Sequence, residues 1–138
     1  MNVLNITDQL PLVSGTPLDL HFLAINAQEA AAAFIAAGTA ANTVRSYRSA
    51  LAYWSAWLQL RYGQALGDAA LPSTVAVQFV VDHMARPTAD GGWVHLLPPT
   101  IDAALVAARV KAKLGPLAYN TVSHRLAVLG KWHRINGW

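Results

Sequence analysis

The fold depends on one stretch, Asn42-Thr43-Val44-Arg45-Ser46-Tyr47-Arg48-Ser49-Ala50-Leu51-Ala52-Tyr53-Trp54-Ser55-Ala56-Trp57-Leu58. At about 100° per residue it predicts an amphipathic helix that continues to Tyr62. Its apolar arc contains Val44, Tyr47, Leu51, Trp54, Leu58 and Tyr62. The opposite arc contains Arg45, Arg48, Ser49, Ala52, Ser55, Ala56 and Gln59. This second arc has no Asp or Glu.

An arc of arginine and small residues without an acid suits close approach to a polyanion such as nucleic acid. The alternative is an ordinary surface that happens to lack acids, because helical spacing alone does not separate the two. At the start of the helix, Asn42 or Thr43 is expected to cap the free amides of the first turn.

Composition restricts the class of protein. A chain of 138 residues is long enough for one domain with a single core. It has no cysteine, so it has no disulfide framework and no thiolate metal site. No charged segment followed by an apolar run indicates a signal peptide, and no apolar run is long enough to predict a membrane span. We therefore expect a cytoplasmic protein.

The charge is unevenly distributed along the chain. Residues 1–44 contain three acids and no Lys or Arg, whereas residues 45–138 contain all ten Lys and Arg and four acids. This asymmetry favours an anionic partner for the second part of the chain. A modestly basic protein without such a partner is the alternative.

The remaining chain predicts further helices around the first one. Residues 1–25 are interpreted as an irregular lead-in, and Asn26 with Glu29 forms the pattern of a capping box. Ser73 and Thr100 are expected to cap later helices, and an extended arm at 93–97 is expected to pack back on the bundle. The β-branched residues near Val75 also permit a strand, but length and polar positions favour a helix. The prediction is an all-α bundle of roughly four or five helices, at 26–38, 42–62, 72–86, 100–114 and 119–136.

The last predicted helix repeats the pattern of the first. Its apolar arc contains Val122, Leu126, Leu129 and His133. Its polar and basic arc contains Asn120, Ser123, His124, Ala127, Lys131 and Arg134. Arg125 lies at the edge of that arc, and the arc again has no acid. Two helices of this kind strengthen the prediction of a polyanion-binding surface.

Three motifs in order resemble a known family. They are Asn42-Thr43-x-Arg45-x-Tyr47-Arg48-x2-Leu51-x2-Trp54-x2-Trp57, then Pro72-Ser73-x-Val75, then Thr121-x3-Arg125-Leu126-x2-Leu129-x3-His133. Together they are similar to the core-binding, SAM-like domain at the N-terminus of tyrosine recombinases, the phage-type integrases. The resemblance covers residues 26–138. The segment from 87 to 116 departs from the minimal four-helix pattern of that domain.

The resemblance implies a domain that clamps recombination-site DNA while a separate C-terminal domain performs catalysis. The family's catalytic residues follow this domain, so we expect none in this chain. Implied partners are double-stranded DNA, the catalytic domain of the same full-length protein, and further copies assembled on DNA only, in a bacterial cytoplasm at the nucleoid. The implied DNA-binding residues are Thr43, Arg45, Arg48, Ser49, Asn120, Thr121, Ser123, His124, Arg125, Lys131 and Arg134.

Each of these positions also has a plainer interpretation. Thr43 and Thr121 can be helix caps, and Asn120 and Ser123 can be ordinary solvent-facing residues. Core packing is the preferred interpretation of Tyr47 and of Trp54, Trp132 and His133. The cations Arg109, Lys111 and Lys113 are interpreted as complementing a helix dipole.

No histidine has metal-ligand spacing, and no catalytic constellation or cofactor motif stands out. We therefore expect no cofactor, no metal and no catalytic residue. The alternative function is a SAM-like protein–protein interaction domain without DNA contact.

Overall fold

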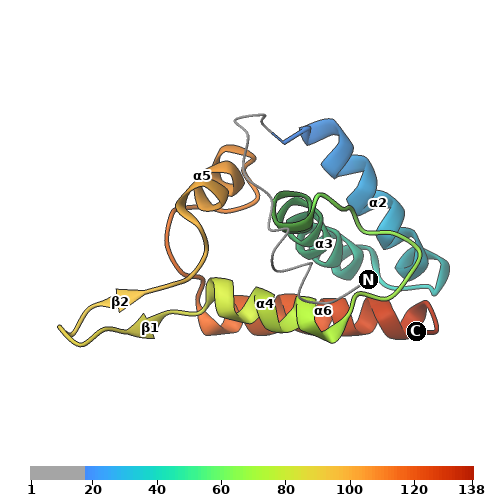
Figure 1. Cartoon of the computed structure of the whole chain (residues 1–138). Coiled ribbons are helices and arrows are strands. Elements are labelled where there is room, and N and C mark those ends of the chain that lie inside the picture. The colour runs from blue at the N-terminus through green and yellow to red at the C-terminus, as the bar shows by residue number, and fades with distance from the viewer. Residues whose placement is uncertain (1–17) are drawn as a thin grey trace.

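The protein is an all-α bundle with one small β-hairpin (Figure 1). The structure is a computed structural model, and it describes residues 18–138. The elements of that part are α2 (Leu20–Ala36), α3 (Ala41–Tyr62), α4 (Ser73–His83), β1 (Arg86–Pro87), β2 (Trp93–Val94), α5 (Pro99–Ala107) and α6 (Tyr119–Ile135). The other helices surround α3, and the hairpin projects away from them (Figure 1). The predicted fold class is confirmed.

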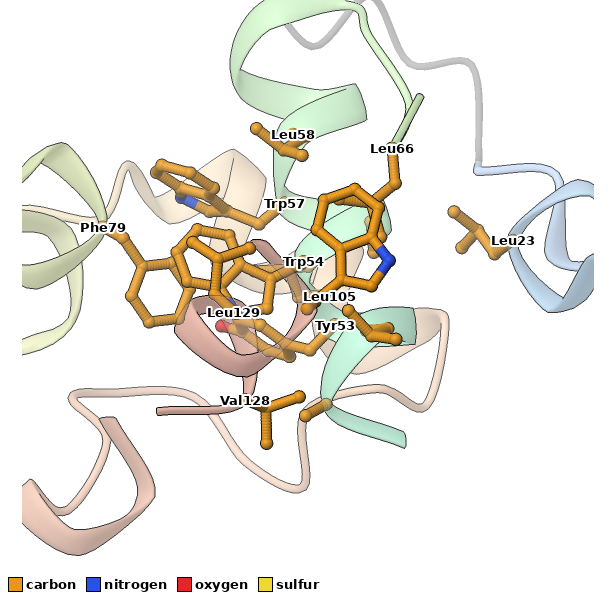
Figure 2. Close-up of a cluster of buried hydrophobic side chains, with 14 of the residues drawn as sticks. Leu23, Tyr53, Trp54, Trp57, Leu58, Leu66, Phe79, Leu105, Val128 and Leu129 are labelled. Carbon is orange, nitrogen blue, oxygen red and sulfur yellow. The ribbon is translucent and has the colours of Figure 1, made fainter. Parts of the chain in front are cut away.

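Helix α3 forms the centre of the core. Trp54 stacks on Phe79 of α4 with ring centroids 4.0 Å apart, and Trp57 meets the same ring edge-on at 5.1 Å. Figure 2 shows these rings gathered with the leucines of neighbouring helices. From Ala50 onwards α3 is buried on almost every side, so Ser55 and Ala56 are fully buried. The predicted polar arc was therefore wrong at Ser55 and Ala56, because neighbouring helices cover them, whereas Ala52 and Gln59 of that arc are half-buried.

Helix α2 begins earlier than predicted. Its N-cap is Asp19, whose Oδ1 accepts from the amides of His21 (3.0 Å) and Phe22 (3.1 Å). The predicted capping box at Asn26 was wrong, because Asn26 is buried and its Oδ1 accepts from Ser55 Oγ at 2.6 Å. The predicted lead-in at 1–25 is corrected from Leu20 onwards, where the chain is helical. Residues 1–17 lie outside the described part.

Both ends of α4 and of α5 also differ from the prediction. The N-caps of α4 and α5 are Pro72 and Pro98, so the predicted caps Ser73 and Thr100 already lie inside the helices. Helix α4 ends at His83 and α5 at Ala107, both earlier than expected. Soon after α5, Arg109 takes a left-handed conformation (φ 62°) that a continuing helix does not permit.

That early turn changes the role of Lys111. The chain folds back and buries Lys111, whose Nζ pairs with Asp102 of α5 and donates to the carbonyl of Gly115. The predicted helix-dipole role was therefore wrong for Lys111. Arg109 and Lys113 lie beyond the end of α5 and are exposed, so they do not belong to its last turn either.

The predicted arm at 93–97 is a hairpin. Trp93 pairs with Pro87 and Val94 with Arg86, in antiparallel register. Trp93 is 68% exposed, so the prediction that this arm packs back on the bundle was wrong for the strand. It was correct for Leu97, which is buried and donates its amide to the carbonyl of Asp82 at 3.0 Å.

A buried ion pair joins α3 to α4. Arg61 donates from Nε (2.8 Å) and Nη2 (2.6 Å) to the carboxylate of Asp82, which also accepts from Trp57 Nε1 at 2.9 Å. Neither charged side chain reaches solvent appreciably. This pair and Lys111–Asp102 remove two cations and two acids from the surface.

Candidate nucleic-acid interface

The N-terminal halves of α3 and α6 border an open groove of about 680 Å³. The two helices with acid-free faces therefore lie next to each other. Their side chains line the groove together: Asn42, Arg45, Ser46, Ser49, Ala50, Asn120, Thr121, His124 and Arg125. No lining residue is acidic, and neither helix contains an Asp or Glu. An anion entering this groove therefore meets donors and cations but no carboxylate.

Both helices begin without a side-chain cap. The N-caps are Ala40 for α3 and Ala118 for α6, and neither alanine has a side-chain oxygen that could accept from the first-turn amides. The capping interpretation of Thr43 and Thr121 was therefore wrong, because both residues already lie within the first turn. Uncapped amides carry the positive end of the helix dipole, which favours anions.

The outer face of α6 is exposed along most of the helix. Its exposed residues include Asn120, Ser123, His124, Ala127, Lys131 and Arg134. Lys131 Nζ donates to the hydroxyl of Tyr47 on α3 at 3.0 Å. The basic arc predicted for this helix is thus accessible to a partner.

The interior face of the same helix has the predicted packing roles. Trp132 is buried, and its Nε1 donates to the carbonyl of Ala30 on α2 at 2.9 Å. His133 Nε2 accepts from the amide of Leu71 at 2.9 Å, and its Nδ1 lies 2.7 Å from the carbonyl of Leu129. His133 is therefore a satisfied structural histidine, as predicted.

The structure gathers some predicted site residues and leaves others beside the groove. Arg45, Ser49, Asn120, Thr121, His124 and Arg125 are among the lining residues. Thr43, Arg48, Ser123, Lys131 and Arg134 are not. Ser123, Lys131 and Arg134 are nevertheless exposed on α6, whereas Thr43 and Arg48 are half-buried.

Three lining residues were missed as site residues by the sequence analysis, the polar Asn42 and Ser46 and the small Ala50. Asn42 accepts from Arg45 Nη1 at 3.1 Å, and Ser46 Oγ lies 3.5 Å from His124 Nε2 across the groove. The signal was present, because Asn42, Ser46 and Ser49 recur at the spacing of one helix face. Asn42 had been considered only as a cap.

Arg125 differs from the other cations of the groove. Its Cζ lies 3.9 Å from the centroid of the Tyr53 ring, a cation–π contact. Partial burial of the guanidinium lowers the pKa of Arg125, yet an arginine stays charged at neutral pH. Within residues 18–138 no carboxylate pairs with it.

The acids that remain at the surface lie elsewhere. Glu29 and Asp68 border a different recess, between α2, the 63–70 loop and the C-terminal part of α6. Asp90 is in the turn of the hairpin, where it accepts from the hydroxyl of Thr88 and the amide of Gly92. These acids lie outside the groove, as does the exposed Asp19 at the start of α2.

Residues 18–138 contain neither a cluster of metal-ligating side chains nor a helix suited to span a membrane. No group of three or more potential metal-ligating side chains is present there. None of the helices described combines the length and the apolarity needed to cross a membrane.

Comparisons with protein-family models, with curated proteins and with solved structures find no match for this chain. The groove and the charges around it are therefore the basis for inferring a function.

Proposed function

We propose that this chain is a DNA-binding domain of the core-binding type, which holds duplex DNA for a tyrosine recombinase. The observation that carries the proposal is the acid-free groove where the uncapped starts of α3 and α6 meet. Phosphate neutralisation supplies most of the affinity of such surfaces, and a single carboxylate nearby would oppose it. The order of motifs along the chain supports the recombinase assignment.

The proposed roles follow from position. Arg45 and Arg125 contact the DNA inside the groove, and Lys131 and Arg134 contact flanking phosphates along α6. Thr121 and Asn120 stand at a helix start, where hydroxyl, amide and backbone donors position a phosphate. Catalysis belongs to a further domain of the full-length protein, and additional copies assemble on the DNA.

The proposal is tested by titrating a fluorescently labelled duplex at about 50 and 200 mM salt. The double variant Arg45→Ala with Arg134→Ala should weaken binding by about tenfold or more, because each charge-assisted contact contributes roughly 1 kcal/mol or more. Its thermal unfolding should change little, since both side chains are exposed.

A matched control removes two cations away from the groove, Arg109→Asn with Lys113→Ala. Both residues are exposed, and asparagine tolerates the left-handed backbone of Arg109. This control should bind the duplex nearly as the wild type does. Equal losses in both double variants would mean that net charge, rather than the cations of α3 and α6, attracts the DNA.

A second candidate function is a SAM-like protein–protein interaction domain without DNA contact. It is favoured by the exposed apolar side chains of Leu20, Phe22, Ile25 and Ile35 on α2. A protein that fails to bind duplex at low salt but self-associates in sedimentation experiments would support this function instead. Substituting Phe22 and Ile35 by serine should then abolish the association.

A further inference from the structure

Arg125 is positioned by one contact of its side chain and one of its backbone. Its guanidinium lies against the ring of Tyr53, and its backbone carbonyl accepts from Trp54 Nε1 at 3.0 Å. Tyr53 is itself fully buried, and its hydroxyl lies 2.7 Å from His83 Nε2. His83 Nδ1 in turn lies 2.7 Å from the carbonyl oxygen of Phe79. A side chain fixed in this way loses little conformational entropy when it binds a ligand.

The guanidinium has unused hydrogen-bonding capacity. Its Nη1 is buried without an acceptor among the described residues, and the chain offers it no carboxylate in that part. The side chain is nevertheless only half-buried, because it also lines the groove. A planar guanidinium without an acid partner suits a ligand with two anionic oxygens.

The shape of the site selects which part of DNA can reach Arg125. The groove is concave, and its two walls are helix starts bearing Arg45, Ser46 and Ser49 on one side and Asn120 and Thr121 on the other. In duplex DNA the base edges are recessed within the grooves, whereas the sugar–phosphate strands form the projecting ridges. A concave protein surface therefore fits a ridge.

We infer that the groove holds the sugar–phosphate backbone of one DNA strand, and that Arg125 donates to a phosphodiester there. This inference rests on the proposed function and makes it more specific. A phosphate contact fixes the register of the protein on the duplex, but it carries no sequence information. Arg125 is thus an anchor for the backbone, and Tyr53 and His83 are its positioning residues. Sequence preference comes from elsewhere on the surface or from the catalytic domain.

The test compares two duplexes of equal length and unrelated sequence. Arg125→Ala should weaken both by the same factor, about tenfold, and lower the magnitude of the salt slope by about one. Arg125→Lys should keep the slope but recover only part of the affinity, since lysine is a point charge that cannot donate as a fork. The Arg109→Asn variant is the matched control and should leave both affinity and slope unchanged.

A second readout uses the wild-type protein, so it does not depend on how well a variant folds. The Nε–Hε resonance of Arg125 should shift on addition of either duplex and reach saturation with the binding curve. A resonance that stays in place at saturating DNA would overturn the inference, as would an Arg125→Ala variant weakened for only one sequence. If the wild type binds neither duplex, the proposed function itself fails.

Discussion

At the scale of single residues, the buried pair Tyr53–His83 makes the fold sensitive to acid. Burial lowers the pKa of His83 to about 4, because the imidazolium would lose its hydration in the core. Burial also raises the pKa of Tyr53, so its hydroxyl keeps its proton and can donate to His83 Nε2. Protonating that nitrogen would remove the acceptor of this hydrogen bond.

The pH dependence follows from linkage. Between pH 6.5 and about 4 the unfolded chain protonates this histidine while the folded chain does not, so stability falls as the pH is lowered through that window. The total loss should be about 3 kcal/mol. We expect urea midpoints to decline between pH 7 and 4.5, and His83→Gln to show a flatter decline from a lower starting value. Parallel profiles for the two proteins would contradict this assignment.

At the scale of elements, α3 and α4 are joined by a charged pair whose halves depend on each other. Arg61→Met leaves the Asp82 carboxylate buried with only Trp57 and Gln78 as donors. Removing one partner of a buried pair costs about 3–5 kcal/mol, which should appear in equilibrium denaturation. Lys113→Met, an exposed cation without an ion pair in residues 18–138, should change stability by less than about 0.5 kcal/mol. Similar losses for both would show that the pair is not what holds these helices together.

The sequence predicted which segments form helices, but it did not predict where each helix begins and ends. Long apolar periodicities around Trp54 and Leu129 give a strong signal, since they persist over several turns. Ends depend on one local residue each, such as Asp19 before α2 or the left-handed Arg109 after α5. A helical wheel could not predict the burial of Ser55 either, because this burial results from the packing of α2 against α3 and from a hydrogen bond to Asn26.

The candidate site was predictable as two helix faces but not as one groove. The absence of acids could be read from the sequence, whereas the contact of Ser46 with His124 is a tertiary fact. The special environment of Arg125 was also hidden, because it depends on a ring presented by another helix. The sequence therefore indicated which cations lie on the two helix faces, whereas the structure shows which of them line the groove, and their role in binding stays a prediction.

At the scale of the whole molecule, charge is sorted by location. Asp82 and Asp102 are in buried ion pairs, and Glu29 and Asp68 border a separate recess. Helices α3 and α6 contain cations and no acid. If Arg45, Arg125, Lys131 and Arg134 each neutralise one phosphate, the logarithm of the binding constant should fall with the logarithm of salt at a slope of about −3 to −4. Titrations over a series of salt concentrations measure this slope. A slope near zero would indicate an apolar contact and favour the face of α2.

The uncapped helix starts have one further consequence, a trade-off between robustness and affinity. Aspartate at Ala40 or Ala118 would cap α3 or α6 and add about 1 kcal/mol to the free energy of unfolding, because natural proteins are rarely at their stability optimum. The same carboxylate would stand at the mouth of the groove and repel a phosphate. Selection for thermal stability alone would therefore favour aspartate at these two positions and abolish anion binding by the groove. Serine would cap the helices without adding a negative charge.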